Sequence, residues 1–147
     1  MKRQEKYPET STFHYYNANP KNRITGDCTF RAICTACEIT WEEAVMGWAE
    51  TVCETKYEGS KSVELFLKKL GWVKQPQPRK ADNTKYTGKE FCKQIAKKNK
   101  RYIANIGGHH IVAIINGKVY DIWDSTDGTI GNYWTKEWNT VINKGMM

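Results

Sequence analysis

Apolar residues recur at helical spacing through the first hundred residues and alternate with polar residues after that. The helical spacing predicts four helices, over about 28–38, 41–52, 60–70 and 88–98. Two of them begin at a capping box, in which Thr40 and Thr87 are each followed three residues later by Glu. We expect the inner face of the second helix to carry Val45, Trp48, Ala49 and Val52.

The alternating pattern predicts strands. The runs RYIANI, HHIVAII, KVYDIWD and NYW are rich in β-branched and aromatic residues, and Asn116-Gly117 between the second and third is a strong hairpin signal. Residues 1–24, punctuated by prolines, are expected to be irregular, and residues 73–83 to form a loop. Helices followed by strands predict one α+β domain over residues 1–147, with N-terminal helices packed on a C-terminal antiparallel sheet.

The overall composition is typical of a folded domain. The chain has 147 residues, enough for one domain with a hydrophobic core, and 39% of them are hydrophobic, with six Trp and eight Tyr. No apolar run approaches the ~20 residues that span a bilayer. The N-terminal stretch MKRQEKYPETSTF is charged but lacks the apolar segment of a signal peptide, so we expect neither export nor membrane insertion.

The cysteines are expected to be reduced thiols. They stand at positions 28, 34, 37, 53 and 92. An odd number in a highly charged sequence favours a cytoplasmic protein. The spacing Cys34-x-x-Cys37 also occurs in redox and zinc sites, but a zinc site needs about four ligands, and no second pair or nearby His follows. With Phe30 and Ile33 the two cysteines continue one helical stripe, so we expect them in the core. No metal or cofactor is predicted.

The net charge of +7 is concentrated in one region. Residues 61–101 contain thirteen Lys and Arg against three acidic residues, whereas the rest of the chain is slightly acidic. Such a region can attract nucleic acid, another anionic polymer or an acidic protein. The alternative is that these side chains form the solvated faces of two short helices.

The stretch TGDCTFRAI, residues 25–33, passes from a turn signal directly into the first predicted helix. Thr25 or Asp27 can cap that helix, which leaves Cys28 at its N-terminus. The N–H groups of a helix N-terminus are unpaired and carry about half a positive charge, and both features lower the pKa of a thiol. Cys28 is therefore either a buried core residue or a nucleophile, and a nucleophile requires a base.

The predicted hairpin supplies a candidate base. A two-residue turn at Asn116-Gly117 places Val112 opposite Asp121. Because side chains alternate between faces, His110 and Asp121 then share a face and are diagonal neighbours. A carboxylate in that position can hold an imidazole in one tautomer while the other ring nitrogen takes a proton from a thiol.

Together, TGDC at a helix start, GHHIVAII and VYDIW resemble papain-like cysteine peptidases, including compact bacterial and phage-type members. The resemblance covers residues 22–123, and the whole sequence is also similar to small phage or prophage proteins classed as peptidases. It implies that Cys28 is the nucleophile, His110 the base and Asp121 the residue that orients the imidazole. The family often has Asn where Asp121 stands, followed two positions later by a tryptophan, here Trp123.

The resemblance also implies an oxyanion hole. The family places an amide side chain about six residues before the nucleophile, and in this sequence that position is Asn22. Asn19 is a second candidate. Backbone N–H groups near Cys28 can stabilise an oxyanion as well.

We therefore expect a thiol hydrolase that cleaves an amide, peptide or isopeptide bond through an acyl-thioenzyme. Its expected substrate is a protein or peptide, including cell-wall peptides. Two alternatives stay open. The same triad acts as an acyltransferase, similar to a transglutaminase, if an amine replaces water, or the scaffold is non-catalytic and its basic region 61–101 binds nucleic acid or a host protein. His109 replaces His110 as the base if the hairpin register slips by one residue.

Overall fold

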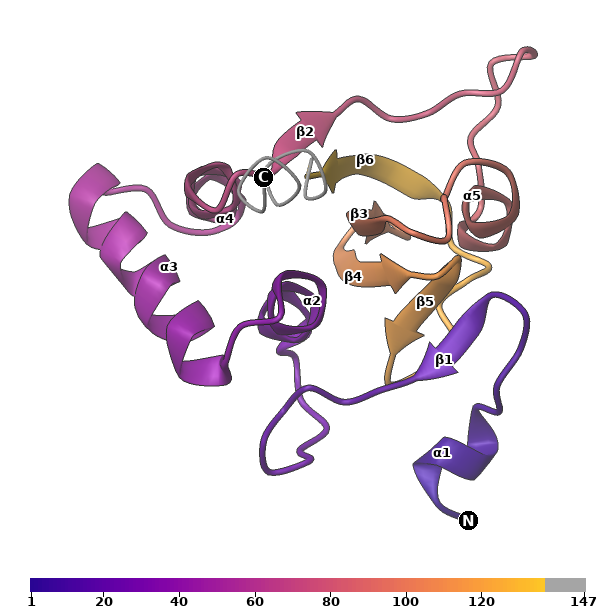
Figure 1. Ribbon diagram of the computed structural model, residues 1–147, viewed down its shortest axis with the longest axis horizontal. Helices are drawn as coiled ribbons and strands as arrows, with labels where there is room; N and C mark the ends of the chain where they lie inside the picture. Colours follow the sequence, from indigo (N-terminus) through magenta and orange to yellow (C-terminus); the bar gives the residue numbers. More distant parts are fainter. Residues whose placement is uncertain (137–147) are drawn as a thin grey trace, which may run out of the picture.

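The computed structural model describes residues 1–136, and a six-stranded mixed sheet lies at its centre (Figure 1). The strands are β1 (Phe13–Tyr15), β2 (Val73–Gln75), β3 (Arg101–Ile106), β4 (His110–Ile115), β5 (Lys118–Asp121) and β6 (Ile130–Thr135). The helices are α1 (Arg3–Lys6), α2 (Cys28–Cys37), α3 (Trp41–Thr55), α4 (Ser60–Lys69) and α5 (Gly88–Gln94). The expected α+β class is confirmed. The expected domain extends to Met147, and residues 137–147 lie outside the described residues.

Two expectations about the sheet are wrong. The strand order is β1-β5-β4-β3-β6-β2, and β1 runs parallel to β5, so the sheet is mixed rather than antiparallel. Residues 1–24 are therefore not wholly irregular. The segment 73–83, expected to be a loop, contains β2, which pairs antiparallel with β6. Both added strands are three residues long, too short for an alternating pattern to be recognised in the sequence.

The hairpin between β4 and β5 has the predicted register. The paired residues are Ala113 with Tyr120, Ile114 with Val119, and Ile115 with Lys118. Asn116 and Gly117 have φ angles of 53° and 68°, as a two-residue turn with two left-handed residues requires. This register places the end of β5 beside the start of β4.

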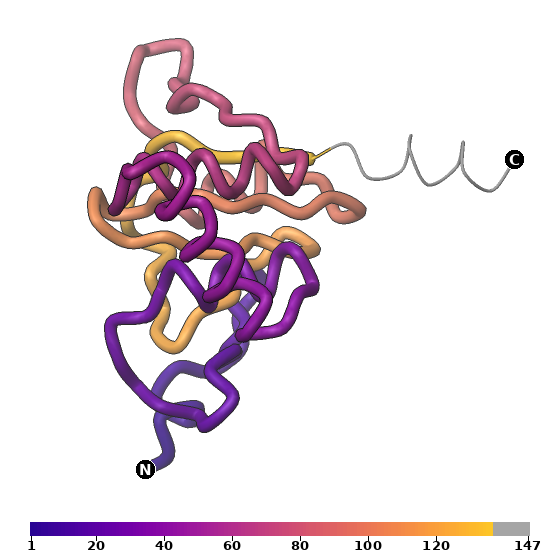
Figure 2. The backbone as a smooth tube through the Cα atoms, turned by 90° about the vertical axis from the view of Figure 1, so that its left-hand side faces the viewer, coloured from indigo at the N-terminus to yellow at the C-terminus, as the bar shows by residue number. Residues whose placement is uncertain are grey.

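Helices cover both faces of the sheet. On one face α2 contributes Ile33 to a core that also contains Ile111 and Ala113. On the other face Phe91 of α5 packs in a core with Ile114. Figure 1 shows α2, α3 and α4 on one side of the sheet and α5 on the other, and Figure 2 shows the N-terminal segment at the opposite end of the molecule from the loop between β2 and α5. Within residues 1–136, none of the helices combines the length and the apolar character needed to cross a bilayer.

The predicted starts of the helices agree with the structure better than the predicted buried faces do. Both capping boxes form, with the hydroxyls of Thr40 and Thr87 each accepting a hydrogen bond from the backbone N–H three residues later. The helix α5 ends four residues earlier than expected. In α3 the buried residues are Ala44 and Thr51, whereas Ala49 is exposed. The hydroxyl of Thr51 donates to a backbone carbonyl one turn earlier, so this polar residue can be buried where an apolar pattern predicts none.

Candidate active site

Cys28 is the first residue of α2, as predicted. Asp27 occupies the N-cap position, but its side chain does not cap the helix. Its carboxylate instead accepts hydrogen bonds from Arg31 Nε at 2.7 Å and from Asn19 Nδ2 at 2.9 Å. The first backbone hydrogen bond of α2 runs from the Arg31 N–H to the Asp27 carbonyl, so the Cys28 N–H has no acceptor within the helix.

His110 and Asp121 meet as the hairpin register predicts. His110 is the first residue of β4 and Asp121 the last of β5, and the distance from His110 Nε2 to Asp121 Oδ2 is 2.6 Å. Since the carboxylate can only accept, Nε2 carries the proton and donates it. The other ring nitrogen, Nδ1, is then the one that remains for Cys28.

The thiol and the imidazole meet at the end of the sheet rather than on one of its faces. By alternation His110 belongs with Val112 and Ile114, which face the α5 side, whereas α2 covers the opposite face. Cys28 and His110 can approach one another because each is the first residue of its element, α2 or β4. The imidazole and the backbone N–H of Ile111 are close enough to the thiol to act on its pKa as hydrogen-bonding groups.

The surroundings of Cys28 and His110 favour a thiolate–imidazolium pair. Burial raises the pKa of the Cys28 thiol, but the hydrogen bonds from His110 and Ile111 and the charge of Arg31 outweigh it and leave that pKa lowered. Burial lowers the pKa of His110, but the hydrogen bonds to Asp121 and Cys28 raise it to about 9. A proton therefore moves more easily from the thiol to the imidazole than it would in water.

Asp121 is buried and fully engaged, with 1% of its surface exposed. Its Oδ2 accepts from His110 and, at 2.9 Å, from the hydroxyl of Ser125. Its Oδ1 accepts at 2.8 Å from Arg31 Nη1 and at 2.8 Å from the backbone N–H of Ile122. Burial raises the pKa of this carboxyl, but the hydrogen bonds and the two cations outweigh it, so the pKa is lowered and Asp121 is ionised.

Trp123 covers the imidazole. Its ring lies 5.2 Å from the His110 ring, centroid to centroid, at an interplanar angle of 37°. The tryptophan is 39% exposed, so it stands between part of the imidazole and the solvent. Trp123 is the tryptophan, two positions after Asp121, that the family resemblance singled out in the sequence.

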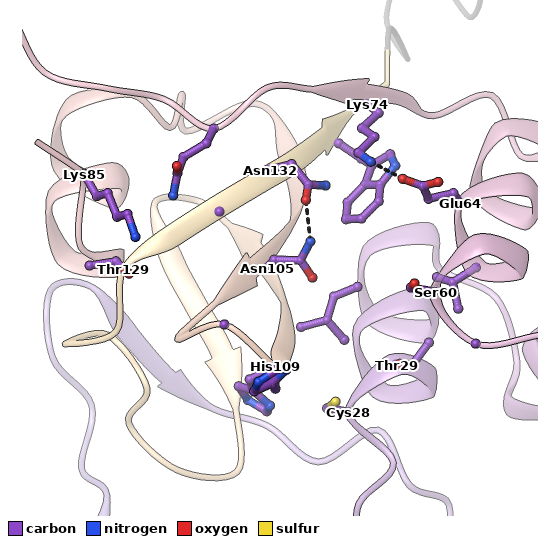
Figure 3. A pocket seen from close by; sticks show the side chains of 18 of the residues that line it. Cys28, Thr29, Ser60, Glu64, Lys74, Lys85, Asn105, His109, Thr129 and Asn132 are labelled. Atoms are coloured by element: carbon purple, nitrogen blue, oxygen red, sulfur yellow. Dashed lines mark hydrogen bonds and ion pairs between the residues drawn. The ribbon is translucent and has the colours of Figure 1, made fainter. Parts of the chain in front are cut away.

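A pocket of about 630 Å³ opens beside Cys28, with Cys28 and His109 at one end and the ion pair of Lys74 with Glu64 at the other (Figure 3). Helices α2 and α4 contribute to one wall and strands β3 and β6 to the other. On the sheet side, Asn105 Nδ2 donates to the side-chain carbonyl of Asn132 at 2.8 Å. The sulfur of Cys28 thus lies on a cleft large enough for a small ligand.

Asn22 is not brought to this cleft. It is exposed in a turn, with a φ of 58°, and it is not among the residues that line the pocket. The amide of the second candidate, Asn19, is engaged with Asp27. His109 is exposed and lines the pocket, while the contact with Asp121 is made by His110.

The sequence did not reveal the partners of Asp121. From the sequence, Arg31 is expected to form at most an ion pair with a nearby acidic group, and Ser125 to belong to a turn. The spacing of Asp27 and Arg31, four residues apart at the start of a predicted helix, is the one local signal for an ion pair there. Nothing local connects Arg31 to Asp121, ninety residues later.

Comparison of the chain with protein-family models, with curated proteins and with solved structures finds no match.

Proposed function

We propose that this protein is a papain-like thiol hydrolase that cleaves an amide, peptide or isopeptide bond in a protein or peptide, cell-wall peptides included, in the cytoplasm. The observation that carries the proposal is the arrangement of Cys28 beside His110, with His110 hydrogen-bonded to the buried carboxylate of Asp121, at the mouth of a pocket. Structural core cysteines have no need of such an arrangement.

The chemistry follows from these positions. The Cys28 thiolate attacks the carbonyl carbon, and a C–S bond forms as the carbonyl oxygen becomes an oxyanion. His110 gives its Nδ1 proton to the leaving nitrogen, the C–N bond breaks and an acyl-thioenzyme remains. A water molecule, deprotonated by His110, then attacks the thioester and releases the acid and the thiol. Asp121 stabilises the imidazolium in both steps.

The Cys28 backbone N–H is one donor for the oxyanion, since the helix leaves it without an acceptor. Asn22 stays the predicted second donor, carried over from the family resemblance. Asn22 is exposed and does not line the pocket, so its role is tested separately, by acylation of Asn22→Ala.

The lining of the pocket suits a substrate that contains amides. The side chains of Asn105 and Asn132 are hydrogen-bonded to each other, and the amino group of Asn132 is buried. The carbonyl oxygen of Asn105 is left to accept a hydrogen bond, which a peptide N–H can donate. An amine bound in the same cleft can replace water and would make the reaction an acyl transfer.

Alkylation of the thiols by iodoacetamide as a function of pH, followed by mass spectrometry, tests the proposal. In the native protein we expect Cys28 to react quickly below about pH 7, and in His110→Ala to react as slowly as an ordinary thiol of pKa ~8.5. Cys34, Cys37 and Cys92 are internal controls, because burial raises their pKa values to about 11, 12 and 12.

The exposed Cys53 is a second internal reference, because it reports the reactivity of an accessible thiol in the same sample. If Cys28 reacts no faster than Cys53 below pH 7, or if His110→Ala does not change its rate, the catalytic proposal is wrong.

A further inference from the structure

We infer that Arg31 is a positioning residue of this site. It joins Asp121 to the helix of the nucleophile and weakens the attraction of Asp121 for the proton of His110. The inference rests on the proposed function, since the Cys28–His110 pair is the one that a thiol hydrolase needs.

Arg31 lies inside the protein and bridges two elements. It is 7% exposed and follows Cys28 by three residues on α2. Its Nη1 donates to Asp121 Oδ1 at 2.8 Å, and its Nε donates to Asp27 Oδ1 at 2.7 Å. A buried guanidinium requires such partners, because an unpaired buried charge is strongly unfavourable. The start of α2 and the end of β5 are therefore fixed to each other through one side chain.

The two oxygens of Asp121 have separate partners. Arg31 and the backbone N–H of Ile122 occupy Oδ1, while His110 and Ser125 occupy Oδ2. With Oδ1 held on both sides, the carboxylate cannot turn, and Oδ2 stays directed at the imidazole. That orientation keeps His110 Nε2 on the carboxylate and Nδ1 towards the thiol.

Arg31 also changes the electrostatic potential at the imidazole of His110. A carboxylate beside a histidine stabilises the imidazolium, and a proton held too firmly cannot be passed to a leaving nitrogen. The cation of Arg31 shares that carboxylate and repels a second positive charge on His110. The ionisable groups around the arginine are Asp27 and Asp121, and those around His110 are Asp121 and Cys28.

The charges of Arg31 and Asp27 predict opposite effects on the pKa of His110 when each is removed. Arg31→Gln removes a positive charge near the imidazole and should raise the pKa of His110. Asp27→Asn removes a negative charge that Arg31 otherwise shares, and should lower the pKa of His110. A residue with only a structural role would weaken folding without moving the imidazole titration in either direction.

The test is an NMR titration of the His110 ring nitrogens in ¹⁵N-labelled full-length protein, with all variants made in a Cys28→Ala background so that no thiol titrates with the imidazole. We expect the pKa of His110 to rise by about one unit in Arg31→Gln and to fall by a smaller amount in Asp27→Asn. The control Arg31→Lys keeps the charge, so it should leave the pKa near that of the background protein while loosening the ring's tautomer preference.

A His110 pKa that stays within 0.2 units in both Arg31→Gln and Asp27→Asn, in folded protein, overturns the inference. If Arg31→Gln does not fold, the pKa of His110 in Asp27→Asn alone decides the inference by the same titration. The titration requires no turnover and no reactive thiol. It therefore gives its answer even if the alkylation of Cys28 shows that the proposed function is wrong.

Discussion

His110 Nε2 and Asp121 Oδ2 lie 2.6 Å apart at the ends of two adjacent antiparallel strands, one diagonal step across the hairpin. The contact fixes which ring nitrogen is protonated and leaves the other for the thiol of Cys28. An aspartate in this position, rather than an amide, adds a full negative charge, and the buried Arg31 compensates it. The site is thus a network of paired charges, in which the removal of one charge leaves its partner uncompensated.

Replacement of Asp121 by Asn tests that balance. Asp121→Asn leaves Arg31 with one carboxylate instead of two and places an amide N–H₂ against either the guanidinium or the imidazole N–H. We expect a loss of about 3 kcal/mol in the free energy of unfolding. The double variant Asp121→Asn/Arg31→Gln should recover part of it, since the glutamine carbonyl can accept from the new amide.

Urea denaturation of the two single variants and the double variant measures the coupling. A coupling energy of about 1–3 kcal/mol is expected for residues in one network. Strict additivity of the two single effects would show that Arg31 and Asp121 do not stabilise each other.

The stability of the protein should depend on pH differently with and without the thiol. The folded pKa of His110 is about 9, above its unfolded value of about 6.5, so this residue alone contributes stability below pH 6.5 that is lost as the pH rises towards 9. In the native protein the pKa of Cys28 is lowered, so this thiol contributes stability that increases as the pH rises towards its unfolded pKa. The change at Cys28 therefore opposes the change at His110.

We therefore expect Cys28→Ala to lose about 1 kcal/mol or more in the free energy of unfolding between pH 7 and 8.5, and the native protein to lose less over that range. Chemical denaturation at several pH values measures both curves. Since Cys28→Ala also removes one of the interactions that raise the pKa of His110, its loss of stability should be complete at a pH below 9. Identical slopes for the two proteins would contradict the thiolate–imidazolium pair.

The sequence predicted the parts of the site that depend on local rules. The turn at Asn116-Gly117 determined the hairpin register, and the register alone brought His110 and Asp121 together. The start of α2 was predictable from the break at TGDC. These features needed only alternation, turn chemistry and helix periodicity.

The rest depends on packing between distant segments. The parallel strand β1 forms because it can pair with the free edge of β5, and three residues are too few to be recognised as a strand in the sequence. The contact of Arg31 with Asp121 joins residues ninety positions apart. Likewise, Cys28 reaches His110 around the end of the sheet, a route that the strand pattern could not reveal.

The role of Asn22 can be separated from the reactivity of the thiol. Alkylation by iodoacetamide forms no oxyanion, whereas acylation by p-nitrophenyl acetate does. If Asn22 completes the oxyanion hole, Asn22→Ala should slow acylation about 10²-fold and leave alkylation of Cys28 unchanged. Lys21→Ala, at the neighbouring exposed position, is the matched control. Equal acylation rates in both variants would leave the backbone N–H groups at the start of α2 as the oxyanion donors.

The basic region 61–101 is expected to bind nucleic acid only weakly. Among the described residues, its cations form ion pairs with acidic side chains that include Lys69 with Glu54, Lys74 with Glu64, Lys80 with Glu90, Lys89 with Asp127, and Arg101 with Glu38. A paired cation releases fewer counterions when it meets a phosphate, so the salt dependence of binding should be shallow.

Fluorescence anisotropy with a labelled 20-base-pair duplex, between 50 and 200 mM salt, measures this dependence in the native protein and in Cys28→Ala. We expect dissociation constants in the range of non-specific binding, about 10⁻⁴ to 10⁻⁶ M at physiological salt, and no difference between the two proteins. Submicromolar binding with a steep salt slope, unchanged by Cys28→Ala, would instead favour a nucleic-acid-binding protein on a peptidase-like scaffold.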